Sequence, residues 1–332
     1  MLAAIENEIG NTPLARLDVR AHGRWLPIHL KLEWWNPTGS IKDRTAAGLV
    51  SGLVHSGALT PRSRLVESTS GNLGVAVASM ARRLGVGFVA VVDPKASPRN
   101  VARMRAAGAT VETVHDRDRV GGYLLARLDR VRALLEAGDQ DLVWLDQYHS
   151  PAGPDMHYRT TGPEIYRQMD GDVDAVCVAV STGGSLAGIA RYLREVSPAT
   201  RIVAVDAVGS SAIGGAQAAR DLVGIGASVP SVLLTDGLVD HRVWVSDADA
   251  FATCRMARRR TGLSIGGSSG ALINGAVRYQ LEHPEATRVV CVLADDGTSY
   301  ADSIYDDRWL ADRGHPLAGG APPVTDMKVG DR

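Results

Sequence analysis

The stretch Asn36-Pro37-Thr38-Gly39-Ser40-Ile41-Lys42-Asp43-Arg44 governs the interpretation of the whole sequence. A Pro/Gly/Ser turn precedes Lys42 and an apolar run over 45–54 follows it, which predicts a helix beginning at or near Lys42. A cation at that end of a helix opposes the helix dipole. The conflict is relieved when the amine is neutral or covalently engaged, as in a catalytic or Schiff-base lysine. A surface lysine in a helix-capping loop is the alternative, so the surrounding motifs must decide.

Length and composition limit the possible classes of protein. A chain of 332 residues is long enough for two domains, and 45% hydrophobic with 22% charged residues is typical of large buried sheets. The net charge of −1, without a long basic run, argues against nucleic acid or an anionic membrane as partner. We see no signal peptide and no apolar run of membrane-spanning length, so we expect a cytoplasmic protein. The three cysteines lack metal-type spacing, and no metal site is predicted.

Segments typical of strands and of helices alternate along the chain. Strands are predicted at 28–33, 64–67, 87–93, 110–114, 143–146, 175–180, 201–206, 243–246 and 288–293. Helices are predicted between them, including 98–107, 121–136 and 266–282. This alternation predicts an α/β fold of twisted, mostly parallel sheets flanked by helices, with ligand loops at the carboxyl ends of strands.

Two Ser/Thr/Gly loops each join a predicted strand to a helix. They are Ser68-Thr69-Ser70-Gly71-Asn72 and Ser181-Thr182-Gly183-Gly184-Ser185. Hydroxyl groups and the N–H groups of a helix start bind carboxylates and phosphates, and glycines let the backbone approach closely. The second loop lacks the Gly-x-Gly-x-x-Gly spacing of a Rossmann fingerprint. A third loop, 266–270, opens another helix and by itself is also compatible with a simple turn.

Together these motifs resemble the pyridoxal-phosphate (PLP) enzymes of the tryptophan synthase β-subunit fold, in the cysteine synthase group. That group has an Asn-Pro-small-small-Ser-x-Lys-Asp-Arg run, a Thr-Ser-Gly-Asn loop, a Gly-Thr-Gly-Gly-Thr phosphate loop and a serine facing the pyridine nitrogen. The four loops match in the same order, within a resemblance that spans residues 9–312. It implies pyridoxal 5'-phosphate as cofactor, an active site in an interdomain cleft, and a homodimer.

The resemblance also implies a role for each loop. Lys42 would form the internal aldimine, Asn72 would bond the 3'-oxygen of the cofactor, and Ser268 would face the pyridine nitrogen. Ser181, Thr182, Gly183, Gly184 and Ser185 would bind the cofactor phosphate, while Thr69, Ser70, Gly71, Gln147 and Tyr148 would bind the substrate. A serine beside the pyridine nitrogen weakens carbanion stabilisation, which suits loss of a β-substituent over transamination.

The same resemblance divides the chain. Residues 40–150 are expected to form a smaller, movable α/β domain with the lysine loop and with the loop 68–72, named the carboxylate loop because Thr69, Ser70 and Gly71 would grip the substrate α-carboxylate. Residues 9–39 with 151–313 are expected to form a larger domain with the phosphate loop and the pyridine-side serine. The tail 314–332 is rich in Gly and Pro and is predicted to be disordered.

The implied reaction is β-replacement on an activated L-serine through an α-aminoacrylate, with Lys42 removing the α-proton and ping-pong kinetics. The segments 67–74, 92–95, 121–124 and 224–228 resemble the N-(2-amino-2-carboxyethyl)-L-glutamate synthases of 2,3-diaminopropionate biosynthesis. Those enzymes join O-phospho-L-serine to the amine of L-glutamate and feed siderophore or peptide-antibiotic pathways. Leu73, where cysteine synthases usually have threonine, favours this branch. A cysteine synthase using O-acetyl- or O-phospho-serine and sulfide is the alternative. A PLP-fold binding protein without turnover is another, against which the intact Lys42 argues.

Two further residues carry open interpretations. Arg127 is the candidate for binding the extra negative charge of phosphoserine or glutamate. It lies four residues after Tyr123 on one helix face, so a surface arginine over that ring is the alternative. His157 is assigned no catalytic role, because a structural histidine fits its position at least as well.

Overall fold

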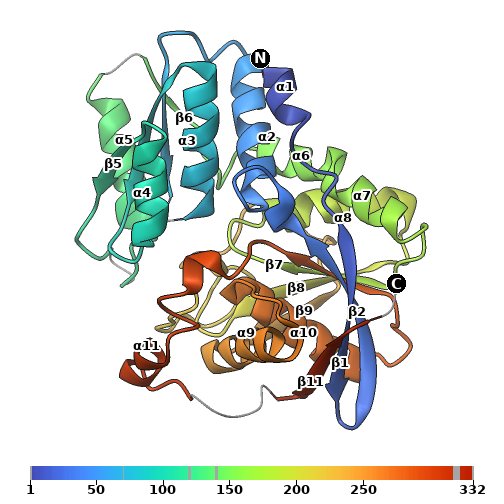
Figure 1. Cartoon of the computed structure of the whole chain (residues 1–332). Helices are drawn as coiled ribbons and strands as arrows, with labels where there is room; N and C mark the ends of the chain where they lie inside the picture. The colour runs from blue at the N-terminus through green and yellow to red at the C-terminus, as the bar shows by residue number, and fades with distance from the viewer. Residues whose placement is uncertain (1, 70, 119–120, 139–140, 317–321, 331–332) are drawn as a thin grey trace.

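A computed structural model describes residues 2–69, 71–118, 121–138, 141–316 and 322–330. Two sheets form its frame (Figure 1), a four-stranded one in the order β5-β4-β3-β6 and a seven-stranded one in the order β11-β1-β2-β10-β7-β8-β9. All strand pairs are parallel except β1 with β2 and β1 with β11. The predicted α/β fold class with mostly parallel sheets is therefore confirmed.

The smaller sheet is covered on both faces by helices. Its strands are β3 (Arg64–Ser68), β4 (Gly87–Val92), β5 (Thr110–Thr113) and β6 (Leu142–Trp144), and its helices are α2 (Lys42–His55), α3 (Asn72–Leu84), α4 (Pro98–Ala106) and α5 (Leu124–Glu136). Along β4, Phe88 and Ala90 pack with α2, α3 and α4, whereas Val89 and Val91 pack with Val131 of α5. Burial on both faces explains why β4 is a continuous apolar run.

The larger sheet is built in the same way around a central strand, β10. Its strands are β1 (Leu14–Ala21), β2 (Arg24–Leu32), β7 (Ala175–Ala179), β8 (Arg201–Ala207), β9 (His241–Val245), β10 (Val289–Leu293) and β11 (Val324–Val329). One face is covered by α7 (Thr161–Gln168) and α8 (Gly184–Val196), and the other by α9 (Asp247–Thr261) and α10 (Gly267–Glu282). The remaining elements are α1 (Leu2–Glu6), α6 (Ala152–Arg159), α11 (Asp307–Asp312), η1 (Glu33–Trp35) and η2 (Thr298–Tyr300).

The prediction of a disordered tail is wrong for its last part. Val324–Val329 form β11, which pairs antiparallel with β1. Val324 and Met327 are buried in the core of the larger sheet, and their burial stabilises this strand. The Gly/Pro-rich composition of the residues before it gave no sign of this. The sequence analysis also missed β1 itself. It joins β2 through His22 and Gly23, both at positive φ (47° and 77°), as a tight right-twisted hairpin requires.

The strands of the smaller sheet come from one continuous stretch of the chain. All four strands of the smaller sheet lie inside the predicted range 40–150, whereas the larger sheet draws on segments before and after it. Movement of one part against the other stays a prediction.

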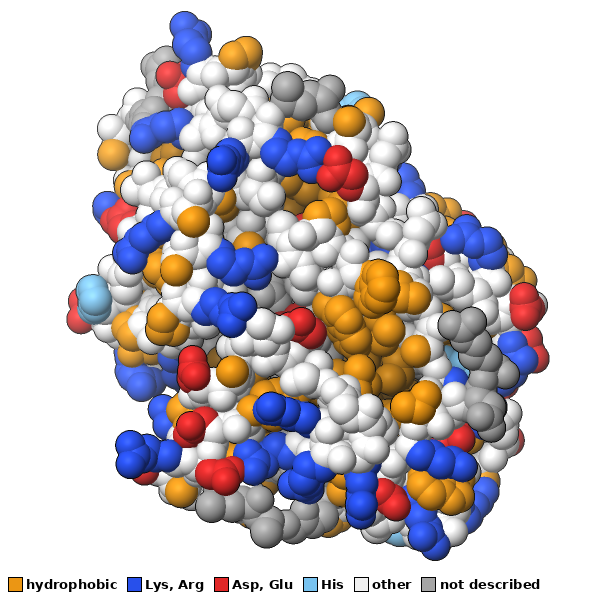
Figure 2. Space-filling view, in the orientation of Figure 1, with side chains coloured by type: hydrophobic (Ala, Val, Ile, Leu, Met, Phe, Trp, Pro, Cys, Tyr) orange, Lys and Arg blue, Asp and Glu red, His pale blue; other side chains and the backbone are white. Residues whose placement is uncertain are grey.

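None of the described helices has both the length and the apolar character that a membrane span needs. Charged side chains of both signs are scattered over the face in Figure 2, around a central apolar area.

Candidate active site

The lysine loop is fixed to the carboxyl end of β10, the central strand. Ile41 N–H donates to Ala294 O over 2.8 Å, and Ser40 pairs with Asp295 in an isolated antiparallel bridge. The Asp43 carboxylate accepts from Thr38 N (3.1 Å) and Thr38 Oγ1 (2.9 Å), which closes the turn before the helix. Helix α2 then begins at Lys42, as the sequence predicted.

The surroundings of Lys42 favour a reactive amine. Desolvation by burial lowers the pKa of Lys42, and the negative charge of Asp295 partly opposes that shift. A lysine with a lowered pKa keeps a larger neutral fraction near neutral pH, and a neutral amine is both a base and a nucleophile. The conflict between Lys42 and the helix dipole is thereby reduced.

A buried ion network holds the start of α2 in place. Arg44 Nε lies 2.7 Å from Glu33 Oε2, Arg44 Nη2 lies 2.7 Å from Glu164 Oε2, and Lys31 Nζ lies 2.6 Å from the same Glu164 oxygen. Burial raises the pKa of Glu164, but hydrogen bonds and charge from Arg44 and Lys31 outweigh it and hold that pKa at about 2. The sequence analysis missed this network, because its partners are up to 133 positions apart.

The carboxylate loop leads into helix α3. Thr69 is buried and its Oγ1 accepts from Gly74 N–H over 3.0 Å, while Gly71 precedes the helix and offers no side-chain cap. Gly74 N–H is thus already used, and the N–H groups of the two residues before it in the first turn are placed to bind an anion. Ser70 lies outside the described residues. Gln147 is tied to this loop, because its Nε2 donates to Ser68 O over 2.8 Å.

The phosphate loop joins β7 to α8. Gly183 has φ of 89°, and a Cβ there would clash with Ser231 Oγ, so only glycine fits. Helix α8 begins at Gly184, whose N–H donates to Thr182 Oγ1 over 3.5 Å, and the next N–H groups of its first turn are placed to bind an anion. Ser185 Oγ lies 3.3 Å from His157 Nε2, and the same nitrogen lies 3.2 Å from Thr45 Oγ1 of α2. His157 thus connects the phosphate loop to the lysine helix.

Burial and the positive charges of Arg44 and Lys42 hold the pKa of His157 well below its usual value, so the imidazole is neutral. Its Nδ1 is also within 2.8 Å of Thr161 Oγ1. A neutral ring bonded to hydroxyl groups on both sides favours the structural interpretation of His157.

Ser268 lies in the first turn of α10 and is almost fully buried. A Cβ on Gly224 would lie 4.0 Å from Ser268 Oγ and 3.6 Å from Tyr300 Oη, so Gly224 lies close to this serine. Tyr300 Oη donates to Asp295 Oδ2 over 2.7 Å, and Asn72 Nδ2 donates to the same oxygen over 2.7 Å. Asp295 therefore joins the elements that carry Lys42, Asn72 and Ser268, although the sequence analysis gave it no role.

Arg127 is not the surface arginine that the sequence left as an alternative. It is buried, and its Nε lies 3.3 Å from Asp93 Oδ2. Burial raises the pKa of the Tyr148 hydroxyl, and the charge of Arg127 and a hydrogen bond from it oppose that rise. Arg127 and Tyr148 are therefore close to each other. The cation stacked on the ring of Tyr123 is Arg117, 5.2 Å from the ring centre.

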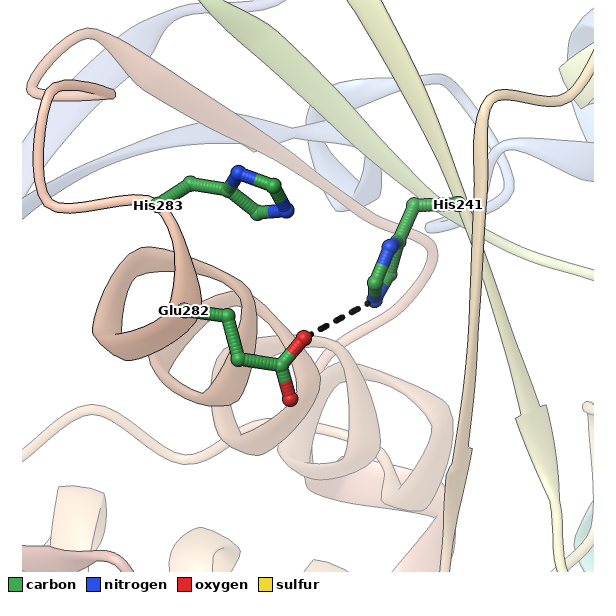
Figure 3. A group of neighbouring side chains, drawn as sticks. All are labelled: His241, Glu282 and His283. Atoms are coloured by element: carbon green, nitrogen blue, oxygen red, sulfur yellow. Dashed lines mark ion pairs between the residues drawn. The ribbon is translucent and has the colours of Figure 1, made fainter.

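A group of possible metal ligands lies at the opposite end of α10 from Ser268. Figure 3 shows His241, Glu282 and His283, with His241 Nε2 3.4 Å from Glu282 Oε2. A helix of 16 residues is about 24 Å long, which separates this group from the loops around Lys42. The group is therefore outside the candidate active site.

The fold and these loops are those of a known class. The chain matches the pyridoxal-phosphate dependent enzyme family over residues 5–295, and it belongs to that family. Pyridoxal phosphate is therefore its cofactor.

Within the family, the chain is similar to enzymes named N-(2-amino-2-carboxyethyl)-L-glutamate synthase. It is 43% identical over 314 residues to the one from Ralstonia nicotianae, covering 94% of this chain and 92% of the relative. It is 41% identical over 314 residues to the one from Cupriavidus metallidurans, covering 93% and 91%. Among solved structures it resembles a hydrogen sulfide-producing enzyme of Fusobacterium nucleatum with an α-aminoacrylate intermediate (TM-score 0.88, 25% identity, 99% and 97% covered).

The described residues fit this cofactor. The α8 start with Gly183 forms an anion cradle, and Lys42 supplies an amine of lowered pKa. Asp295 Oδ1 is one of several buried polar atoms that have no hydrogen-bond partner among the described residues, and Asp295 is bridged to the lysine loop. Buried polar atoms are normally satisfied, so an unpaired one at this place is consistent with a polar ligand near the lysine loop.

Proposed function

We propose that this enzyme performs β-replacement on O-phospho-L-serine with the amine of L-glutamate, giving N-(2-amino-2-carboxyethyl)-L-glutamate and phosphate. The bond from Cβ to the phosphate oxygen breaks and a bond from Cβ to the glutamate nitrogen forms. The observation that carries the proposal is the 43% identity, over 94% of the chain, to a relative of that name. We also propose that the product is a 2,3-diaminopropionate precursor for a siderophore or peptide natural product.

Pyridoxal phosphate, when bound, withdraws electrons from the α-carbon of an amino acid. We propose that Lys42 Nζ accepts the α-proton, because its lowered pKa makes it a base near neutral pH. The N–H groups at the start of α3 would hold the substrate carboxylate, and those at the start of α8, with Ser181, Thr182 and Ser185, would hold the cofactor phosphate. Asn72 and Ser268 would contact the cofactor ring from opposite loops.

Arg127 is our candidate for favouring acidic substrates. It lies close to Tyr148, a proposed substrate-binding residue, and is buried where charge is poorly screened. Asp93 neutralises part of its charge, but a guanidinium carries five N–H donors. We therefore propose that Arg127 acts mainly through directed hydrogen bonds, in concert with Tyr148.

Product analysis tests the proposal. The purified holoenzyme is incubated with O-phospho-L-serine or O-acetyl-L-serine, each crossed with L-glutamate or sulfide, and products are identified by mass spectrometry. We expect the amine product and phosphate from the first donor with glutamate, and no product from Lys42→Ala. Efficient cysteine formation from O-acetylserine and sulfide, with no amine product, would instead establish the cysteine synthase alternative. That alternative is favoured by the structural likeness to a hydrogen sulfide-producing enzyme.

We further propose a homodimer. Trp35, next to the lysine loop, is 68% exposed, and large exposed aromatic side chains are enriched at interfaces. Size-exclusion chromatography with light scattering tests this, and a monomer at micromolar concentration would contradict it.

A further inference from the structure

Asp295 is a buried carboxylate at the point where the loops of the candidate site meet. It lies two residues after the end of β10, and its backbone is bridged to Ser40, two residues before Lys42. Only 5% of its surface is exposed. Burying a carboxylate is unfavourable unless the site compensates its charge, so its presence here requires an explanation.

Only one of its two oxygens is satisfied. Oδ2 accepts from Asn72 Nδ2 and from Tyr300 Oη, each over 2.7 Å, whereas Oδ1 has no hydrogen-bond partner among the described residues. Any side chain on Gly266 would collide with Oδ1, so the fold keeps space for this oxygen. A purely structural carboxylate would gain from pairing both oxygens.

The contact with Asn72 fixes the orientation of its amide. A carboxylate accepts hydrogen bonds only, so the atom of Asn72 facing Asp295 must be the NH₂ group. Asn72 Oδ1 is 3.5 Å from Asn100 Nδ2, which agrees with this orientation. The second hydrogen of the NH₂ group then remains a donor for the cofactor.

We propose that Asp295 is a positioning residue that orients the Asn72 amide as a donor to the cofactor and is the counter-charge of the free Lys42 amine. When Lys42 Nζ accepts a proton from the substrate it becomes a cation, and the Asp295 carboxylate stabilises that cation. The inference rests on the proposed role of Lys42, but not on the identity of donor or acceptor.

The electrostatics agree with the geometry. Burial raises the pKa of Asp295 to about 6, although hydrogen bonds from Tyr300 and Asn72 and the charge of Lys42 favour its ionised form. Asp295 is thus mainly ionised above pH 6. The titratable or charged groups that face it are Lys42 of α2, Tyr300 of η2, its neighbour Asp296, and Cys254 of α9.

The first test uses the cofactor-free protein, so it does not depend on turnover. Competitive acetylation, quantified by mass spectrometry of the Lys42 peptide between pH 6 and 10, measures the reactivity of the free amine. Asp295→Asn removes the counter-charge, so the labelling profile of Lys42 should move to lower pH. Its rate at pH 8 should rise by about threefold or more.

Asp296→Asn is the matched control. It removes the same charge one residue away, where the carboxylate bonds Thr298 N (2.9 Å) and Thr298 Oγ1 (2.7 Å). This variant should label like the parent protein. An unchanged Lys42 profile in folded Asp295→Asn, or an equal shift in Asp296→Asn, would overturn the counter-charge role.

Tyr300→Phe provides a second route if Asp295→Asn fails to fold. It keeps the carboxylate and the bond to Asn72, but removes a hydrogen bond that favours the ionised form. The visible absorbance of the bound cofactor is titrated toward low pH. The pH at which this absorbance changes should be higher in Tyr300→Phe than in the parent protein. An unchanged absorbance titration would contradict the proposal. If the proposed role of Lys42 is itself wrong, Lys42→Ala will keep the normal absorbance band of the bound cofactor, so the two failures can be told apart.

Discussion

Glu67 offers a quantitative test of the interior beneath the carboxylate loop. It is fully buried at the end of β3, where Oε1 accepts from Ser68 N (2.7 Å) and Oε2 from Gln147 N (3.1 Å). Burial raises its pKa to about 8, with a smaller contribution from Asp146 and opposition from the backbone hydrogen bonds. The side chain is therefore mostly protonated at neutral pH in the folded protein.

The sign of the pH effect follows from linkage. Between the ordinary glutamate pKa of 4.5 and a folded value of about 8, the folded protein holds a proton that the unfolded chain has lost. The contribution of Glu67 to the free energy of unfolding is thus fully present below pH 4.5 and falls as the pH rises to 8. At about 1.4 kcal/mol per pH unit, the loss between pH 5 and pH 8 is about 3 to 4 kcal/mol.

Glu67→Gln removes the titration and nearly keeps the shape. We expect its free energy of unfolding, relative to the parent, to increase by about 3 kcal/mol between pH 5 and pH 8. Urea unfolding of both cofactor-free proteins, followed by circular dichroism, measures this difference and cancels the other ionisable groups. Glu136→Gln, at an exposed position on α5, is the control and should give a constant difference. A constant difference for Glu67→Gln as well would refute the raised pKa.

Four other changes test the candidate site. Lys42→Ala should stay folded and bind pyridoxal phosphate through the α8 cradle but show no turnover, and normal turnover in that variant would remove Lys42 from the mechanism. Gly183→Ala should weaken cofactor binding at least about tenfold in a fluorescence titration, because its Cβ would clash with Ser231 Oγ at a positive φ. Ser268→Asp should shift the cofactor spectrum toward a protonated pyridine and slow β-replacement, and an unchanged spectrum would show that Ser268 does not face the nitrogen. Arg127→Ala should raise KM for phosphoserine or glutamate about tenfold and lower the free energy of unfolding by about 3 to 5 kcal/mol, since the buried Asp93 loses its cationic partner and keeps the hydrogen bond from Lys95 N; unchanged kinetics would leave Arg127 only a structural role.

Local patterns predicted the fold where the signal was local. The strands β4, β7 and β10 are continuous apolar runs buried on both faces, and the sequence marks them clearly. β1 and β11 depend on long-range pairing, and β1 mixes charged and apolar residues because it lies near the edge of the sheet. Pairing of Leu17 with Val329 across the whole chain leaves no mark within a short window of sequence.

The same reasoning applies to the site. Lys42, Asn72, Gly183 and Ser268 lie in compact motifs, so their loops were recognisable from sequence. Asp295 acquires its significance only when the fold brings it against Asn72, 223 positions away. The sequence left a surface position open for Arg127, because its partner Asp93 follows strand β4 and does not lie on the same helix.

The charges near Lys42 support a special role for Asp295. The buried ion network at the start of α2 contains two cations, Lys31 and Arg44, and two carboxylates, Glu33 and Glu164, so its formal charges cancel. The Asp43 carboxylate is occupied by hydrogen bonds from Thr38 N and Thr38 Oγ1 in the turn before the helix. Burial lowers the pKa of Lys42, and the carboxylate whose charge opposes that lowering is that of Asp295. A neutral network can fix the helix without setting the charge of the amine, which leaves that task to a carboxylate just after β10, the strand to whose end the lysine loop is itself bonded.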